Sequence, residues 1–230
     1  MNDGFRRART EEQRAERREA IVAAALELLD EVRVTDLTLT ELARRSGLAK
    51  SNVLRYFESR EAVLLDVYNR EFRDWLDGLE RELPPPAEAD IESVAAALAG
   101  TAAGRPRLCE LAATSQAVLE RNLSAGVAAT YKLAFIANAR RFADIVGGRL
   151  GGFSENASIA LAGMVILGIG GIWAGTRPSP GMEAAYDLFP ELAAMRHDLE
   201  ASLHEFIATT LAGLAHREPN PIAAEAREST

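Results

Sequence analysis

Polar side chains of the kinds that hydrogen-bond to nucleic acids are gathered within seven residues of this sequence. They are Lys50, Ser51, Asn52, Arg55 and Tyr56. Asn can pair bidentately with adenine and Arg with guanine, while Lys, Ser and Tyr can bond to phosphate oxygens. Because a polar helix face is usually only solvated, this cluster becomes informative through the elements that hold it.

The residues just before the cluster predict a short helix that ends in a tight turn. Thr38 and Glu41 precede an apolar periodic segment with the spacing of a capping box, so we expect a helix to begin near Thr38. Gly47 follows where a chain can leave a helix with a positive φ. A second short helix after this turn would point Val53 and Phe57 into the interior. The order of these elements predicts a helix-turn-helix.

From Thr38 to Arg60, and on through a helix expected over residues 59–72, the sequence resembles the DNA-binding domain of the tetracycline-repressor (TetR/AcrR) family. The residues that carry the resemblance are Thr38, Leu42-Ala43, Gly47-Leu48-Ala49, Val53-Leu54, Tyr56-Phe57 and Ser59-Arg60-Glu61. The likeness covers residues 11 to about 79. The candidate DNA-binding residues are Thr38, Thr40, Arg45, Lys50, Ser51, Asn52, Arg55, Tyr56 and Arg60.

Two residues depart from the family pattern. Ala49 stands where the family usually has a capping Ser or Thr, so the second helix is expected to lack about 1 kcal/mol of cap stabilisation. Leu54 stands where a DNA-facing Tyr is common. Since Leu can instead meet a thymine methyl group, we expect a changed operator preference from this residue.

The whole chain is predicted to be helical. Its 230 residues are 48% hydrophobic and 26% charged, which is typical of a globular protein, and Pro and Gly are clustered between long Ala- and Leu-rich segments. We expect an all-α fold with a three-helix DNA-binding domain over residues 1–60 and a helical ligand-binding and dimerisation domain over residues 61–230. Helices are expected at 59–82, 90–103, 106–122, 124–147, 155–175 and 195–216.

The net charge of −8 is unevenly distributed along the chain. Residues 1–60 hold 12 Lys and Arg against 11 Asp and Glu, whereas the other 170 residues hold 14 against 23. A near-neutral head can still bind DNA, because contacts between cations and phosphates are local.

The Arg-rich start of the chain has two interpretations. It can form an arm that reaches over a phosphate backbone or into the minor groove, and the better arm candidates are Arg6, Arg7 and Arg9. It can equally be a solvated, charged helix face, an interpretation at least as good for Arg14, Arg17 and Arg18.

Residues 157–174, ASIALAGMVILGIGGIWA, are uncharged and just long enough to span a membrane. We interpret them instead as a buried helix, because much of the segment is Gly and Ala and no basic cluster flanks it. The resemblance implies that this helix and the last one form a four-helix bundle between two subunits. Candidate interface residues are Gly163, Gly168, Gly171, Leu199, Leu203, Phe206, Ile207 and Leu211. Such a dimer would present two recognition helices to a palindrome.

The resemblance also implies that the body binds a small ligand whose occupancy changes the spacing of two DNA-reading heads. Candidate ligand-binding residues are Trp75, Tyr131, Phe135, Met164 and Trp173. Aromatic and Met residues at helical spacing more often belong to a core. Few charges interrupt the middle helices, which favours an apolar, aromatic or lipid-like ligand over a sugar or a phosphate.

The sequence lacks the motifs of the common enzymes. It has no Gly-rich phosphate loop, no Gly-x-Ser-x-Gly elbow and no Cys/His metal cluster, so we expect no catalytic residues, no cofactor and no metal. The single cysteine, Cys109, excludes a disulfide within the chain, which fits a reducing cytoplasm.

Taken together, these patterns favour a cytoplasmic, homodimeric transcription regulator that binds a palindromic operator and responds to a small ligand. Repression is favoured over activation, because occupancy of an operator by itself blocks polymerase. Two alternatives stay open. One is a helical small-molecule-binding protein or enzyme that has lost DNA binding, which the departures at Ala49 and Leu54 support. The other is a membrane-tethered protein.

Overall fold

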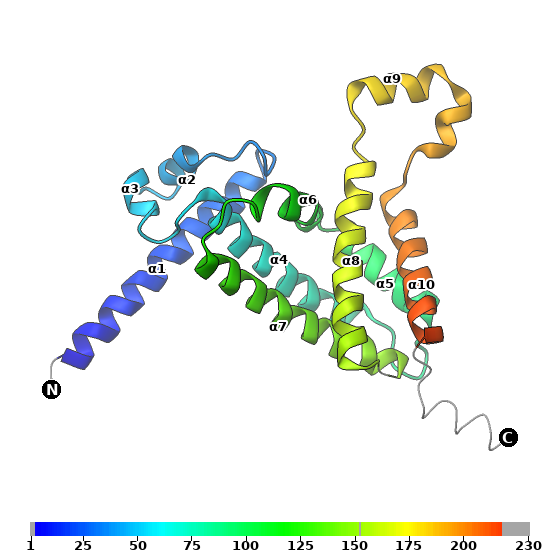
Figure 1. Ribbon diagram of the computed structural model, residues 1–230, viewed down its shortest axis with the longest axis horizontal. Coiled ribbons are helices and arrows are strands. Elements are labelled where there is room, and N and C mark those ends of the chain that lie inside the picture. Colours follow the sequence, from blue (N-terminus) through cyan, green and yellow to red (C-terminus); the bar gives the residue numbers. More distant parts are fainter. Residues whose placement is uncertain (1–2, 152, 218–230) are drawn as a thin grey trace. The chain divides into compact units, whose positions relative to one another are not determined.

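The computed structural model describes residues 3–151 and 153–217, with the side chains described from residue 11 onward. In these residues the fold is all-α, as the sequence predicts, and contains no strand (Figure 1). The elements are α1 (Asp3–Leu29), α2 (Leu39–Arg45), α3 (Lys50–Val53), α4 (Arg60–Glu82), α5 (Ile91–Ala103), α6 (Pro106–Thr114), a π-helical turn η1 (Ser115–Leu119), α7 (Ala125–Leu150), α8 (Glu155–Gly175), α9 (Pro180–Leu188), a 3-10 segment η2 (Pro190–Met195) and α10 (Leu199–Arg217).

The chain divides into two compact units. The head unit comprises Met1–Arg70 and Thr114–Tyr131, and the body unit comprises Glu71–Ala113 and Lys132–Thr230. The helices α4 and α7 each contribute residues to both units. The domain boundary expected at residue 60 falls at the first residue of α4 and stays a prediction.

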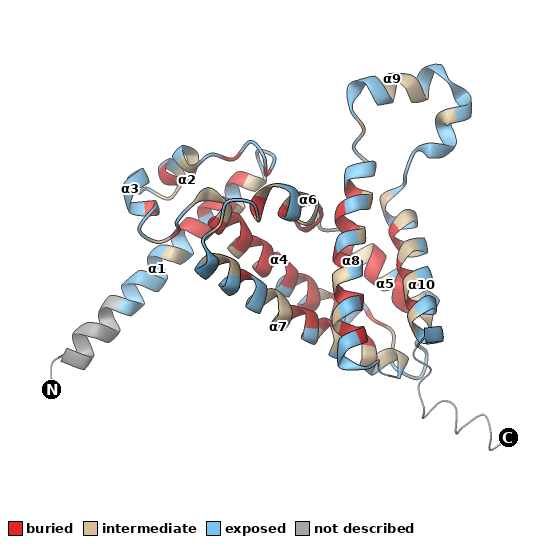
Figure 2. Cartoon of the chain, viewed as in Figure 1, coloured by how far each residue is buried: buried red, intermediate tan, exposed pale blue. Residues whose placement is uncertain are grey.

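The head unit buries one face of α1 against the helix-turn-helix. Ile21, Val22 and Leu28 of α1 are buried, and so are Leu42 of α2 and Val53 of α3 (Figure 2). These side chains recur at helical spacing, so each short helix contributes an apolar stripe to a shared core. α2 and α3 are too short to be stable alone, and this packing holds them in place.

The capping box predicted for α2 is present. The backbone N–H of Glu41 donates to Oγ1 of Thr38 at 3.2 Å, and the backbone N–H of Thr38 donates to Oε2 of Glu41 at 3.2 Å. The turn that follows passes through Gly47, whose φ of +66° lies in the left-handed region that favours glycine. Both predictions for this turn are confirmed.

The segment before α7 belongs to the head unit and is tied to it by a hydrogen bond. The backbone N–H of Ser124 donates to Oε1 of Glu58 at 2.7 Å. Hydrogen bonding from Ser124 lowers the pKa of Glu58, so this carboxylate stays ionised at neutral pH.

The body unit is a helical bundle with a tightly packed centre. α10 lies against α5 and α8. The ring centroid of Trp75 lies 5.8 Å from that of Phe72 and 5.9 Å from that of Phe142. α8 approaches α6 closely at Gly170, where a Cβ would lie 2.8 Å from the backbone of Ala112. A larger residue at position 170 would therefore force the two helices apart.

Three elements differ from the sequence predictions. The helix expected over residues 106–122 ends at Thr114, and a π-helical turn replaces its second half. The last helix begins at Leu199 rather than at Met195. Met195 is instead the last residue of η2. The sequence analysis missed α9, although Ser179 caps it by accepting from the N–H of Met182 and Pro180 occupies its first turn, a common start signal.

Candidate nucleic-acid interface

The exposed face of α3 carries the polar residues that the sequence analysis placed there. Lys50, Ser51, Asn52 and Arg55 are exposed. On the opposite face Val53 and Phe57 are only 0% and 4% exposed. The buried pair anchors this short segment, so its polar side chains project from the head and are free to contact another molecule. Tyr56, beside them, is half-buried.

The two departures from the family pattern are visible in the geometry of α3. Ala49 occupies the N-cap position with an extended backbone and makes no side-chain hydrogen bond to the helix. Leu54 is 44% exposed, so its side chain lies on the surface beside the polar cluster. An apolar side chain at this place is able to meet a thymine methyl group.

The two threonines of the candidate set lie at the start of α2. The hydroxyl of Thr38 accepts from Glu41 N–H and donates to Oε2 of Glu41 at 2.8 Å, so it is occupied by the cap. Thr40 lies in the first turn and is exposed.

Two arginines of the candidate set are held inside the head by ion pairs. Arg45 donates to both carboxylate oxygens of Glu31, at 2.8 Å and 2.7 Å, and these hydrogen bonds to Glu31 raise the pKa of the arginine. Arg60 pairs with Glu61 at 2.9 Å and donates to the carbonyl of Leu37, also at 2.9 Å. Their guanidinium groups already have partners within the head, and a contact of either residue with DNA stays a prediction.

Arg18 has a structural role that the sequence analysis did not assign to it. Its guanidinium group lies 4.0 Å from the centroid of the Phe57 ring, donates to the carbonyl of Tyr56 at 2.9 Å and pairs with Asp66 of α4 at 3.2 Å. It thereby fixes the backbone directly after α3. The signal was present in the sequence, because Arg18 precedes the core residue Ile21 by three positions and so faces the core.

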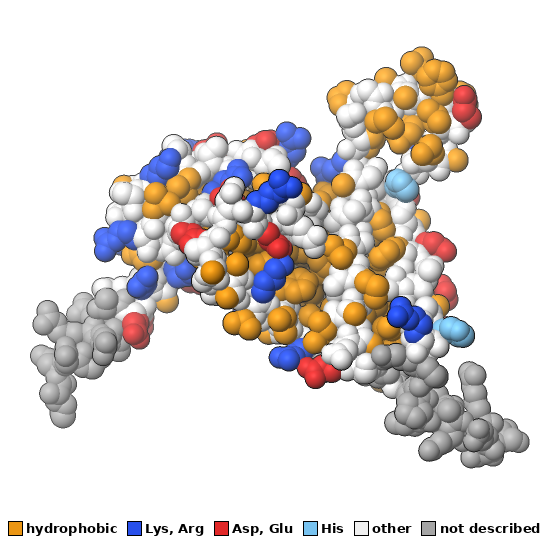
Figure 3. Space-filling view, viewed as in Figure 1, with side chains coloured by type: hydrophobic (Ala, Val, Ile, Leu, Met, Phe, Trp, Pro, Cys, Tyr) orange, Lys and Arg blue, Asp and Glu red, His pale blue; other side chains and the backbone are white. Residues whose placement is uncertain are grey.

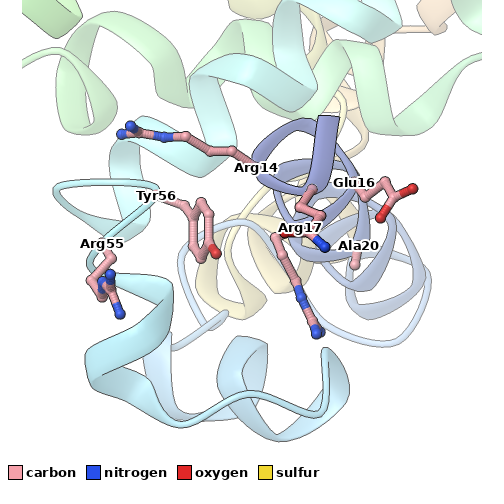
Figure 4. Close-up of a pocket in the computed structure, with 7 residues that line it drawn as sticks. Arg14, Glu16, Arg17, Ala20, Arg55 and Tyr56 are labelled. Atoms are coloured by element: carbon pink, nitrogen blue, oxygen red, sulfur yellow. The ribbon is translucent and has the colours of Figure 1, made fainter. Parts of the chain in front are cut away.

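A groove of about 740 Å³ lies between α1 and the end of α3. Its lining residues are Gln13, Arg14, Glu16, Arg17, Ala20, Arg55 and Tyr56. In the close-up the Tyr56 side chain lies between Arg55 and Arg17 (Figure 4). The sequence analysis placed Arg55 and Tyr56 on the recognition face, and the fold adds the arginines of α1 to the same surface.

The arm candidates Arg6, Arg7 and Arg9 lie where α1 is already helical, since α1 begins at Asp3. Their side chains lie outside the described residues. The backbone of these residues belongs to the first turns of a 27-residue helix, and their role as an arm stays a prediction.

The candidate interface residues of α8 and α10 fall into two groups. Leu203, Ile207 and Leu211 are completely buried within the chain, because this stripe of α10 packs against α5 and α8. Phe206 covers Gly168, whose Cβ would lie 2.2 Å from the ring. These residues hold the bundle together within the chain, and a contact of theirs with a second subunit stays a prediction.

The second group consists of open positions. At Gly163 and Gly171 a Cβ would meet no atom within 4 Å, and Leu199 at the start of α10 is half-buried. Beside these glycines, Met164 and Leu167 of α8 are 38% and 54% exposed. Figure 3 shows hydrophobic side chains at the surface along α8.

α8 is, among the described helices, the one that is long and apolar enough to cross a membrane. Half of its most apolar window is buried inside the chain. Core helices of soluble proteins pass the same test, so this property is weak support for a membrane span.

The candidate ligand-binding residues do not form one group. Trp75 is fully buried and donates to the hydroxyl of Thr101 at 3.0 Å, while Phe135 packs against Phe72 with centroids 5.5 Å apart. Tyr131 belongs to the head unit, where it stacks on Tyr68 and where burial raises its pKa. On α8, Trp173 is buried beneath the guanidinium of Arg177, and Met164 lies on the surface.

The described residues contain no group of three or more His, Cys, Asp or Glu that could hold a metal ion. Cys109 is buried, and burial raises the pKa of its thiol to about 12. A thiol with this pKa stays protonated at neutral pH, so it is a poor nucleophile.

The chain was compared with known families and proteins. Residues 21–67 match the family described as "Bacterial regulatory proteins, tetR family", and residues 69–218 match the family described as "Tetracyclin repressor-like, C-terminal domain". No curated protein sequence matches this one.

Solved structures share the fold along most of their length. A TetR transcriptional regulator from Rhodococcus sp. RHA1 superimposes with a TM-score of 0.57 at 20% identity, over 88% of this chain and 99% of the other. Thermus thermophilus FadR, a TetR-family transcriptional repressor in complex with lauroyl-CoA, gives 0.56 at 23% identity, over 86% and 94%. FadR from Bacillus halodurans, a fatty acid degradation regulator, gives 0.52 at 17% identity, over 85% and 98%.

Proposed function

Since this chain belongs to the tetracycline-repressor (TetR) family of transcription regulators, we propose that it is a homodimeric repressor that leaves a palindromic operator when a small apolar ligand binds its helical body. Members of this family regulate transcription and are not enzymes, in agreement with the sequence prediction. The operator, the dimer and the repressor role are the proposed parts.

The observation that carries the proposal is the outward-facing polar side of α3. Asn52 of α3 and Arg55 of the turn directly after it are exposed, and they are the residue types that make bidentate contacts with adenine and guanine in the major groove. The buried pair on the opposite side fixes the orientation of α3, so little freedom is lost when it enters the groove. Lys50 and Ser51, at the start of the same helix, supply donors for phosphate oxygens.

The proposed dimer rests on the uncovered apolar stripe of α8. Its members follow one another at alternating spacings of four and three residues, and they are Ala160, Met164, Leu167, Gly171 and Ala174. Each of them is exposed. This spacing is the repeat by which two helices pack along a common seam. The open glycines Gly163 and Gly171 would let a partner backbone approach closely. A dimer of this kind would bring two copies of α3 to one DNA molecule, as a palindromic operator requires.

The ligand class is supported by a solved structure with a similar fold that holds an acyl-CoA. Thermus thermophilus FadR is described in complex with lauroyl-CoA. The helices of this chain's body are rich in apolar side chains, which favours a lipid-like ligand. α4 contributes to both units and provides a continuous path from the body to the head. A ligand that prefers the non-binding state by about 3 kcal/mol would weaken DNA binding roughly 150-fold.

The test is binding of the purified protein to the DNA that flanks its own gene, measured by fluorescence anisotropy with random duplex DNA as competitor. The expected result is saturable binding to one palindromic segment that survives the competitor, with a stoichiometry of two chains per site. Weak binding to every duplex would contradict the proposal that this protein recognises a specific DNA sequence. Since an operator can also lie elsewhere, selection from random-sequence DNA completes this measurement.

Lauroyl-CoA is the probe for the ligand, with coenzyme A alone as its control. We expect lauroyl-CoA, and not coenzyme A, to release the bound DNA. Binding of lauroyl-CoA to a protein that recognises no DNA sequence would instead support the alternative function, a helical small-molecule-binding protein. The uncapped α3 and the exposed Leu54 are the observations that favour this alternative.

A further inference from the structure

The cations of the helix-turn-helix region differ in whether the protein itself neutralises them. Between residues 11 and 60, four arginines pair with a carboxylate: Arg18, Arg33, Arg45 and Arg60. Within the part of the chain that the structure describes, the other five cations form no ion pair: Arg14, Arg17, Arg44, Lys50 and Arg55. An unpaired surface cation keeps its full charge available for a bound anion.

Three of these five unpaired cations line the same groove. They are Arg14 and Arg17 from α1 and Arg55 from the end of α3. The groove has one acidic lining residue, Glu16, which in the close-up points away from Tyr56 (Figure 4). The groove is therefore positively charged, and the phenol group of Tyr56 adds a hydrogen-bond donor between the cations.

Residues 11–17 of α1 contribute no side chain to the core of the head. Residues 11–17 are all exposed, and the first buried residues of the helix are Ile21 and Val22. Arg14 and Arg17 are three residues apart, so they lie on the same side of the helix, and Figure 4 shows both beside Tyr56. Packing within the head does not explain their position.

We propose that this groove binds the backbone of duplex DNA, and that Arg14 and Arg17 each contact a phosphate of one strand at the edge of the major groove while α3 reads the bases. The inference rests on the proposed function. A helix in the major groove has a sugar-phosphate strand on each side, so cations beside that helix meet phosphates. The guanidinium group suits this task, because its planar set of N–H donors matches two phosphate oxygens.

The experiment is the salt dependence of binding to a 30-base-pair random-sequence duplex, measured for the full chain and for Arg14→Ala/Arg17→Ala. Each lost phosphate contact lowers the slope of log K against log salt concentration by about 0.9. We expect the slope to fall by about 1.8 for each head on the DNA, with an affinity loss on the order of 10- to 100-fold at 0.1 M salt.

The matched control is Arg73→Ala/Arg81→Ala, which removes the same charge from two exposed positions of α4. Arg14→Lys/Arg17→Lys, which keeps the charge, should retain most of the slope. A slope for the α1 variant equal to that of the control would overturn the proposal. Far-UV circular dichroism should show that the two alanine double variants are folded, since Arg and Ala have similar helix propensities.

A second readout separates this proposal from the proposed function. On an operator obtained by selection, the α1 variant should lose affinity for operator and random duplex by the same factor, so that their ratio is unchanged. A fall in that ratio would mean that α1 reads bases, and would overturn the phosphate assignment. If the unaltered protein discriminates no sequence, the proposed function fails, while the slope on random duplex still tests the groove.

Discussion

Two helices of this chain leave a face uncovered, and the two faces differ in chemistry. On α3 the uncovered residues are polar or charged, among them Lys50 and Asn52. On α8 they are apolar, with Met164 and Leu167 38% and 54% exposed. Both helices bury their opposite side in the chain, Val53 on α3 and Leu161 on α8 being fully buried.

The difference teaches which kind of partner each face requires. A polar face is well hydrated when free, so it can bind and release a partner, and its binding to DNA weakens with salt. An apolar face costs about 25 cal/mol for every Å² left in water. A face of this kind is more stable when it is permanently covered. In the proposed function the reversible partner, DNA, therefore belongs to α3, and the lasting partner, a second subunit, belongs to α8.

The largest effect is expected from a charge placed on the α8 stripe. Leu167→Lys should put an unpaired charge into the subunit interface and cost about 3 kcal/mol or more, which raises the Kd of the dimer at least 100-fold, measured by analytical ultracentrifugation. The matched control is Leu133→Lys on α7, because Leu133 is 67% exposed and lies outside the stripe. Equal dimer Kd values for the two variants would contradict the proposal that the α8 stripe forms the subunit interface.

The next effect concerns the polar face of α3. Asn52→Ala and Arg55→Ala should each reduce the preference for the operator over random duplex by about 1–3 kcal/mol, measured by competition anisotropy, while the dimer remains intact. Arg44→Ala removes another exposed, unpaired arginine from the helix-turn-helix and should leave the preference unchanged. An unchanged preference in the Asn52 and Arg55 variants would place base reading elsewhere.

A smaller effect is expected from the residue that supports α3 from α1. Arg18→Ala removes the contacts to Phe57, Tyr56 and Asp66. Because the side chain is 42% exposed, we expect a loss of about 1–2 kcal/mol in the free energy of unfolding, measured by urea denaturation. The Arg17→Ala variant, changed at the position just before Arg18, should have the same midpoint urea concentration of unfolding as the parent protein.

The smallest effect is expected at the N-cap of α3. Ala49 already has the extended backbone of a cap, with φ −68° and ψ 147°, so Ala49→Ser should supply the missing hydrogen bond and stabilise the protein by about 1 kcal/mol. The measurement is the thermal unfolding midpoint, which should rise. Ala129→Ser, at an exposed interior position of α7, should not raise it. No increase for the position 49 variant would mean that α3 is held by packing alone.

The sequence by itself determined the features that depend on neighbouring residues. The capping box of Thr38 and Glu41, the positive φ of Gly47 and the buried pair of Val53 and Phe57 are all as predicted. Each of them is set by residues at most four positions apart, through a local hydrogen bond, a backbone preference or the pitch of a helix. The same holds for the all-α fold, which helical periodicity predicted along most of the chain.

Only the tertiary structure decided which of several equivalent residues has a partner. The sequence shows a row of arginines, but the pairing of Arg45 with Glu31 and of Arg18 with Asp66 requires segments that are 14 and 48 residues apart in sequence to meet. The same limit applies to α10, where periodicity predicts a buried stripe and does not say what covers it. Leu203 and Leu211 are covered within the chain, because periodicity identifies an apolar face, whereas the packing of the whole bundle selects the element that buries it.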